Sequence, residues 1–230
     1  MVIGTDERRH AWMDEGLASF SEDLFTPSLF PDAPGAVGSM RGYLRIAGTD
    51  DETESMRAAD LYGPSGNRGT ASYGKPATVF RALRAILGAD TFDLAMRTYM
   101  RRWAFRHPDP VDLFNSFEDV TGEDLDWFFQ PWMYTTGVMN QAVVDVVTEN
   151  GGTTVIVLED RGEIAMPVHL EFMTADGSVV RVRADQDVWE DGRAEIRVTV
   201  GDRVTLVVLD PDQQFPDIDR DDNRWVGPMR

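Results

Sequence analysis

The chain has 230 residues, of which 42% are hydrophobic and 10% aromatic, so it can bury a core and is not intrinsically disordered. Its 40 Asp and Glu residues outnumber 22 Lys and Arg residues, and the formal net charge of -18 argues against nucleic acid or an anionic membrane surface as partner. The absence of cysteine excludes disulfides, thiolate zinc ligands and cysteine nucleophiles, and leaves the redox compartment open.

The amino-terminal residues are not expected to be a signal peptide. Residues 1–9 lack the basic leader and the apolar core of a signal peptide, and no apolar run in the chain approaches the roughly 18–20 residues of a membrane span. The sequence therefore leaves the compartment unknown, although a longer parent protein could be exported to the periplasm or the cell exterior.

Through the first 138 residues, apolar side chains recur at helical spacing. Capping residues, prolines and glycines mark where the predicted helices begin and end. The predicted helices are Trp12 to about Phe25, ended by Pro27 and Pro31; residues 76–87, opened by Pro76 and closed by Gly88; a helix capped by Asp90 that reaches Trp103; a helix capped by Asp109 and closed by Gly122; and Leu125–Met133, bent or shortened by Pro131. Loops are predicted at Ser28–Gly38 and Gly63–Gly69.

From about Met139 the pattern changes to short, Val-rich runs that alternate apolar and polar residues. The predicted strands are Ala142–Val147, Thr153–Leu158, Ala165–Met173, Val179–Arg183, Ala194–Val200 and Val204–Leu209. Six or seven short strands at this spacing are typical of an antiparallel, Ig-like β-sandwich. The sequence thus predicts an α+β chain of two domains, a helical lobe at 1–138 and a β-sandwich at 139–230.

Two short segments hold residues that could carry chemistry. The sequence Trp12-Met13-Asp14-Glu15-Gly16 places two carboxylates at the start of an otherwise apolar helix, where acids also stabilise the helix dipole by a few tenths of a kcal/mol. Tyr73 lies between a Gly-rich loop and a helix, where its hydroxyl could donate to a developing oxyanion or its ring could simply pack at the helix entrance.

Together these segments resemble the gluzincin zinc aminopeptidases of peptidase family M1, the family of aminopeptidase N and leukotriene hydrolase. In that family a His-Glu-x-x-His motif is followed about 18 residues later by a ligand Glu in a Trp-x-Asn/Asp-Glu-Gly setting, which Glu15 occupies. The segment Tyr73-Gly74-Lys75-Pro76 is similar to the family's Tyr-x-Lys-Gly/Pro segment, whose Tyr stabilises the tetrahedral intermediate. Phe128–Tyr134 and Gly137 resemble the end of the same domain, and the strand-rich remainder resembles the β-sandwich that follows it. The resemblance implies a thermolysin-like carboxyl-terminal lobe.

The zinc-binding motif itself is missing from this sequence. No His-Glu-x-x-His occurs, and each of the three histidines, His10, His107 and His169, is expected to have a structural role. Because a histidine about 18 residues before Glu15 would precede Met1, the resemblance implies a carboxyl-terminal fragment cut after the zinc-binding helix. The family's Gly-x-Met-x-Asn-type segment, which reads the substrate amino terminus, is missing too.

The resemblance implies that the parent protein hydrolyses peptide bonds at peptide amino termini. Glu15 would be the third zinc ligand, and Tyr73 would be a catalytic residue that donates a hydrogen bond to the oxyanion. Without two His ligands and the general base, this chain by itself is expected to hold no zinc and to be inactive. Two alternatives stay open: a non-catalytic protein- or peptide-binding module on the same fold, and an inactive homologue that begins at Met1.

Two structural expectations follow from the resemblance. The Tyr73 hydroxyl and the Glu15 carboxylate should lie on one face of the helical lobe, separated by roughly the width of a metal-bound substrate. Loss of the zinc-motif helix should also leave apolar surface exposed and favour self-association through the helical lobe as salt rises. Part of the apolar surface around Trp12, Phe20, Phe80 and the Leu125–Met133 helix is expected to lose its cover.

Overall fold

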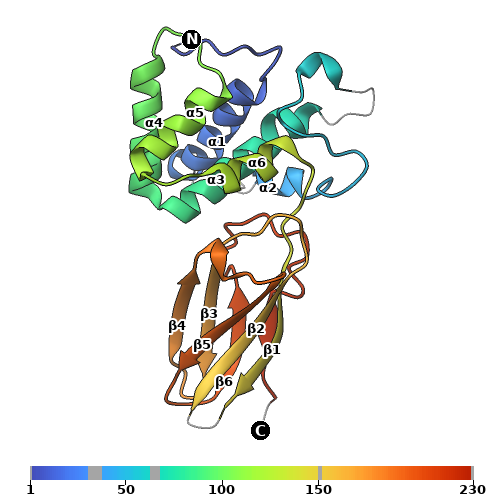
Figure 1. Cartoon of the computed structure of the whole chain (residues 1–230), viewed down its shortest axis with the longest axis vertical. Helices are drawn as coiled ribbons and strands as arrows, with labels where there is room; N and C mark the ends of the chain where they lie inside the picture. Colours follow the sequence, from blue (N-terminus) through green and yellow to red (C-terminus); the bar gives the residue numbers. More distant parts are fainter. Residues whose placement is uncertain (1, 31–37, 63–67, 150–151, 229–230) are drawn as a thin grey trace. The chain divides into compact units, whose positions relative to one another are not determined.

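The computed structural model describes residues 2–30, 38–62, 68–149 and 152–228 (Figure 1). The chain divides into two compact units, Met1–Gly137 and Val138–Arg230. The first unit is helical and the second is built of antiparallel strands, so the α+β fold class is confirmed. Most of the predicted loops at Ser28–Gly38 and Gly63–Gly69 lies outside the described residues, as do two residues of the predicted turn at 150–152. Within the described residues, no helix is long and apolar enough to cross a bilayer.

The helical unit packs around aromatic side chains from several of its helices. Its elements are α1 (Trp12–Leu29), α2 (Gly38–Tyr43), the 3-10 turn η1 (Ala59–Leu61), the π-helical turn η2 (Thr70–Gly74), α3 (Lys75–Leu87), α4 (Ala89–Trp103), α5 (Pro110–Thr121) and α6 (Asp126–Tyr134). The Trp12 and Phe114 rings stack with centroids 6.0 Å apart, and Phe114 stacks on Phe129 at 4.1 Å. These contacts join α1, α5 and α6 into one core.

Several helix ends follow from local sequence, as predicted. The Asp109 carboxylate accepts hydrogen bonds from the Val111 and Asp112 amides, and the Asp112 carboxylate accepts one from the Asp109 amide, which completes a capping box at the start of α5. Gly122 ends α5 in the left-handed region with φ of 73°, and Gly88 ends α3 with φ of 79°.

Pro27 and Asp90 behave differently from the prediction. The helix α1 continues past Pro27 to Leu29, because a proline in the last turn removes only one amide donor before the helix ends anyway. Pro131 lies inside α6, which continues to Tyr134, so it does not shorten the predicted helix; a bend at Pro131 stays a prediction. Asp90 does not cap α4: Gly88 is at the N-cap position, and Asp90 lies in the first turn, where its charge favours the helix dipole.

The second unit contains two antiparallel sheets. Its strands are β1 (Gln141–Thr148), β2 (Thr153–Asp160), β3 (Val168–Thr174), β4 (Val179–Ala184), β5 (Arg193–Thr199), β6 (Val204–Leu209) and β7 (Arg224–Val226). The sheet orders are β1-β2-β5 and β4-β3-β6-β7. Alternate residues of β3, such as Leu170 and Phe172, join Ile156, Leu158 and Val207 in a buried apolar cluster. Among the strands of the described residues, the prediction missed only β7, whose three residues are too few to show a pattern.

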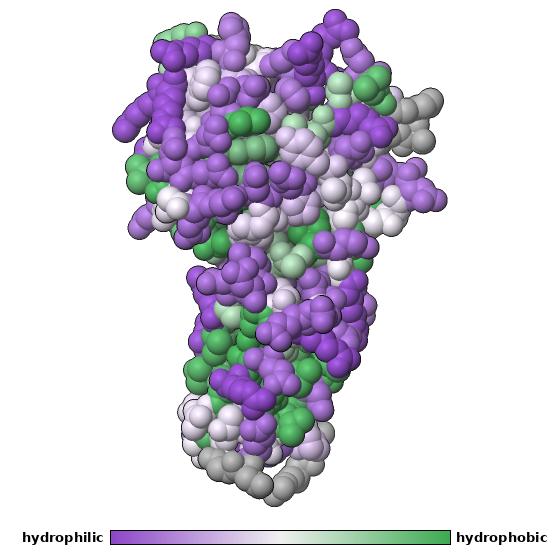
Figure 2. Space-filling model, in the orientation of Figure 1, coloured by the Kyte–Doolittle hydropathy of each residue, from purple (hydrophilic) through white to green (hydrophobic). Residues whose placement is uncertain are grey.

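Apart from the half-buried Trp127, the apolar side chains named in this expectation are buried. Trp12 is 0% exposed, Phe20 6% and Phe80 1%, and the apolar side chains at 125, 128, 129, 132 and 133 are at most 1% exposed. Phe20 packs against Phe80 and Phe92, so the rings of α1, α3 and α4 cover one another. On the face drawn in Figure 2, the helical unit is covered mainly by hydrophilic residues. Self-association of the chain stays a prediction, but these residues no longer supply its reason.

Candidate functional site

The first turn of α1 presents Glu15 at the edge of the aromatic core. Trp12, Met13 and Gly16 are buried in this turn, whereas Glu15 is half-buried. The helical period therefore turns one side of α1 into the core and leaves the Glu15 carboxylate at the boundary with solvent.

A glycine lets α1 pass unusually close to the start of α3. A Cβ atom built on Gly16 would lie only 2.6 Å from Cβ of Pro76, a distance that real side chains essentially never show. Gly16 is thus required by the close approach of the two helices. This close approach brings Glu15, which precedes Gly16, next to the turn that carries Tyr73, three residues before Pro76.

Tyr73 and Glu15 meet at this crossing. Tyr73 lies on the π-helical turn η2, and its hydroxyl donates a hydrogen bond to Glu15 Oε1 at 2.5 Å. The two groups therefore share one face of the helical unit. The predicted separation by the width of a substrate is wrong, because the Gly16–Pro76 approach brings the phenol into direct contact with the carboxylate. The Tyr73 side chain is 41% exposed, so the pair is open to solvent.

The environment keeps the Tyr73 phenol protonated. The hydrogen bond to Glu15 raises the pKa of Tyr73, and partial desolvation and the negative charge of Glu15 raise it further. Arg68 opposes this rise, whereas Asp14 adds to it. At neutral pH the hydroxyl is therefore a hydrogen-bond donor.

The described residues do not by themselves form a zinc site around Glu15. A catalytic zinc ion needs about three protein ligands. Within the described part of the chain, the acids and histidines that lie close enough in a group of three are Glu118, Asp124 and Asp126, and Glu15 is not among them. Glu15 alone offers one carboxylate, so the donors among the described residues do not fit a complete zinc centre.

The three histidines lie in other surroundings. Nδ1 of His107 lies 2.8 Å from the Gly4 carbonyl oxygen, which ties the amino-terminal segment to the residues after α4. The His169 ring packs 4.7 Å from the Phe215 ring in the second unit, and burial lowers its pKa. His10 is half-buried, and desolvation lowers its pKa as well. Among the described residues, none of them joins Glu15 in a group of three donors.

A buried ion pair formed by Lys75, two residues after Tyr73, was not predicted from the sequence. Lys75 and Glu52 are both 0% exposed at their side chains, and Nζ of Lys75 donates to Glu52 Oε1 at 2.7 Å and to the Thr135 carbonyl oxygen at 2.7 Å. The ammonium also lies 5.6 Å from the centroid of the Tyr43 ring. Desolvation lowers the pKa of Lys75, while the Glu52 charge and hydrogen bond raise it.

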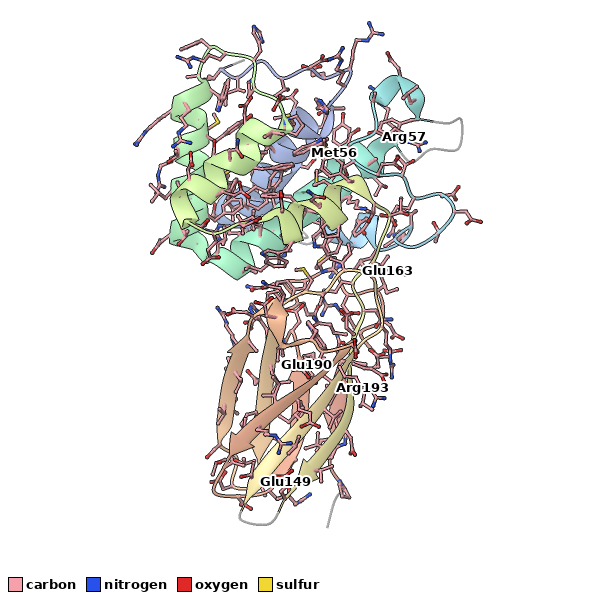
Figure 3. All side chains as sticks on the ribbon, in the orientation of Figure 1. Met56, Arg57, Glu149, Glu163, Glu190 and Arg193 are labelled. Atoms are coloured by element: carbon pink, nitrogen blue, oxygen red, sulfur yellow. The ribbon has the colours of Figure 1, made fainter. Side chains whose placement is uncertain are left out.

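The segment that supplies Glu52 is held in place by backbone and side-chain contacts. The other oxygen of Glu52 accepts a hydrogen bond from the Gly48 amide at 2.6 Å. The Met56 amide donates to the Met133 carbonyl of α6 at 3.1 Å, and Arg57 pairs with Glu54 at 3.0 Å; Figure 3 labels Met56 and Arg57 in this segment. The sequence marked residues 49–54 only as a polar run, and no local pattern links that run to a lysine 23 residues later.

Comparisons with known proteins point to one family. Residues 2–132 match the model of the Peptidase family M1 domain. Membrane alanyl aminopeptidase of Manduca sexta is 25% identical over 142 residues, which are 55% of this chain and 14% of that protein. Aminopeptidase M1 of Arabidopsis thaliana is 29% identical over 136 residues, 56% of this chain and 15% of that protein. Aminopeptidase N of Streptomyces lividans is 31% identical over 67 residues, 29% of this chain and 8% of that protein.

The fold has a counterpart among solved structures. The crystal structure of Legionella pneumophila aminopeptidase A in complex with aspartic acid aligns with 90% of this chain and 24% of that chain, with a TM-score of 0.67 and 16% sequence identity. At that identity the likeness concerns the fold. The chain thus spans about a quarter or less of the length of these similar proteins.

Proposed function

Because the chain belongs to peptidase family M1 over residues 2–132, we propose that its helical unit contributes Glu15 and Tyr73 to an aminopeptidase-type hydrolytic site. One observation carries the proposal: the Tyr73 hydroxyl and the Glu15 carboxylate, which come from segments 58 residues apart, meet at 2.5 Å. The family is zinc-dependent in general, and in this proposal Glu15 is one carboxylate ligand of such a site.

Tyr73 supplies a proton donor beside that carboxylate. In the structure the single hydroxyl proton of Tyr73 is donated to Glu15 Oε1. In the proposed reaction the hydroxyl exchanges this acceptor for a negatively charged oxygen that develops next to Glu15. Removal of a single oxyanion donor typically costs about 3–4 kcal/mol of transition-state stabilisation. The substrates would be peptides cleaved at their amino termini, the chemistry that the names of the similar proteins share.

We also propose that this chain alone is inactive, because its described residues offer Glu15 without two further donors. After the chain has been incubated with zinc and dialysed against metal-free buffer, metal analysis is expected to find clearly substoichiometric zinc. Aminoacyl anilides are expected to stay uncleaved. Stoichiometric zinc together with hydrolysis would contradict this proposal.

A chimaera tests the two residues directly. Residues 2–134 of this chain, which include the matched residues 2–132, would replace the corresponding segment of Arabidopsis thaliana aminopeptidase M1, which aligns with 56% of this chain. In an active chimaera, Tyr73→Phe is expected to lower kcat by about 100- to 1000-fold. The matched control is Tyr134→Phe, which removes the hydroxyl of another half-exposed tyrosine and should leave kcat unchanged.

The same chimaera tests Glu15. Glu15→Gln is expected to lower its zinc content, whereas Glu22→Gln, at an exposed position of the same helix, is not. An unchanged kcat in Tyr73→Phe would refute the catalytic role. A folded chimaera that binds peptides without cleaving them would instead favour the alternative, a non-catalytic peptide-binding module.

A further inference from the structure

Three separate segments of the helical unit meet at the Lys75 ammonium. Lys75 begins α3, Glu52 lies in the segment between α2 and η1, and Thr135 directly follows α6. The 2.7 Å hydrogen bonds from Lys75 Nζ to Glu52 and to the Thr135 carbonyl therefore fix the start of α3 against both neighbours. Because the Lys75 side chain is 0% exposed, it cannot reach a substrate.

Stability alone is a weak explanation for this ion pair. Two charges that leave water lose several kcal/mol of hydration each, and replacing a buried pair by apolar groups of similar volume is often neutral or stabilising. What such a pair does provide is a defined geometry, because its hydrogen bonds are directional and a misplaced buried charge is costly. A pair at the start of α3 thus selects one placement of that helix end.

The Tyr73-bearing turn is attached directly to this point. Tyr73 lies two residues before Lys75, in a π-helical turn, and such turns are rare and depend on their surroundings. On one side, Gly16 of α1 contacts Pro76; on another, a Cβ on Gly74 would lie 3.4 Å from the Ser39 carbonyl oxygen of α2. These two contacts limit how closely α1 and α2 approach the η2–α3 junction. The hydrogen bonds of Lys75 add the attractive contact that holds the turn in position.

We propose that Lys75 is a positioning residue that holds the η2–α3 junction so that the Tyr73 hydroxyl meets the Glu15 carboxylate. The effect of Lys75 on catalysis rests on the proposed function, but the positioning of Tyr73 is a property of this chain and can be measured on it. Glu52 is its counter-charge, and the Thr135 carbonyl is its second acceptor.

The test uses nuclear magnetic resonance of the whole chain with 13C-labelled tyrosine. Five tyrosines are present, and Tyr73→Phe identifies the Tyr73 signal. Glu15→Ala marks the chemical shift of Tyr73 Cζ when the hydrogen bond is absent. The signal is then recorded at one pH in Lys75→Met and in the double variant Lys75→Met with Glu52→Gln.

The two variants separate positioning from stability. Lys75→Met leaves the Glu52 carboxylate buried without its partner and should be strongly destabilised, whereas the double variant removes both charges and should recover most of the lost stability. We expect the Tyr73 signal to move most of the way to its Glu15→Ala position in both variants. If Lys75 only stabilised the unit, the signal in the double variant would return to the wild-type position, and that result would overturn the inference.

Phe92→Leu serves as the control for nonspecific loosening. It removes volume from a fully buried site of the aromatic core without touching the ion pair, so the Tyr73 signal should stay in place. A displaced signal in this control would also count against a specific role of Lys75. A Tyr73 signal at its wild-type position in the double variant overturns the positioning role of Lys75 but not the proposed function. An unchanged rate in the Tyr73→Phe chimaera overturns the proposed function but not the positioning role.

Discussion

Gly16 decides how closely Glu15 can approach Tyr73. Alanine at this position would place its Cβ 2.6 Å from Pro76 Cβ. This clash cannot be relieved by a side-chain rotation, because the proline ring is closed onto its own backbone. We expect Gly16→Ala to destabilise the helical unit by about 1–3 kcal/mol, as overpacked cores do, and to lengthen the Tyr73–Glu15 hydrogen bond.

Urea unfolding followed by helical circular dichroism measures this loss. The control is Gly42→Ala in α2, where a Cβ would meet no atom within 4 Å. Because alanine favours helices over glycine, Gly42→Ala should be neutral or slightly stabilising. Equal stability of the two variants would mean that α1 and α3 can separate without cost.

Asp160 gives the second unit a measurable pH dependence. Burial raises its pKa from 3.8 to about 6, and the charges of Asp217 and Glu163 add to the rise, although a hydrogen bond from the Gly162 amide lowers it. Between about pH 4 and pH 6 the folded unit therefore holds a proton that the unfolded chain releases. The contribution of Asp160 to stability accordingly falls as the pH rises through this window.

Asp160→Asn should remove this dependence, because the amide oxygen still accepts the Gly162 hydrogen bond but carries no charge. The variant is expected to have a higher Tm than the parent at about pH 7 and little or no advantage at about pH 4. Asp202→Asn, at an exposed turn, is the matched control and should change neither value. A gain for Asp160→Asn that is the same at both pH values would contradict the assigned cause.

At the scale of single elements, α5 shows how a local signal specifies a helix. Asp109 caps its start through two amides, so Asp109→Ala should destabilise the helical unit by about 1 kcal/mol. Asn115→Ala, at an exposed position in the middle of the same helix, should not destabilise it. Thermal unfolding of the two variants checks the difference, which would vanish if tertiary packing alone held α5 in place.

Predictability from the sequence follows the range of the interaction. The cap at Asp109 and the end at Gly122 depend on neighbours within a turn, so the sequence predicts them correctly. The π-helical turn before Lys75 and the short strand β7 depend on partners far along the chain, and the sequence shows neither. Pro27 lies between these cases, since a local rule for proline overstated its effect in a last helical turn.

The candidate site divides in the same way. Two motifs, around Glu15 and around Tyr73, identify the residues, but their spacing in space depends on how closely α1 and α3 pack. The partner of Lys75 was beyond prediction, because the run that contains Glu52 reads as solvated charge until the fold buries one member of it. Buried charges of this kind need the tertiary structure to be recognised.

For the whole molecule, charge and apolar surface oppose each other. The net charge of -18 disfavours association at low salt, and screening reduces this repulsion to a range of about 8–10 Å at physiological ionic strength. The aromatic core residues are buried, so other apolar side chains would have to drive any self-association. Near the end of α1, Phe25, Leu29 and Phe30 are 58%, 69% and 64% exposed.

We therefore expect sedimentation velocity to show association that grows between about 0.05 and 0.5 M salt, through the end of α1. The double substitution Phe25→Ser with Leu29→Ser should abolish the increase, because it removes most of the exposed apolar area of the last turns. Leu61→Ser, at a residue that is 68% exposed in η1, removes a comparable side chain elsewhere and should leave the increase intact. A monomer at both salt concentrations would show that these exposed side chains are too few to overcome the cost of association.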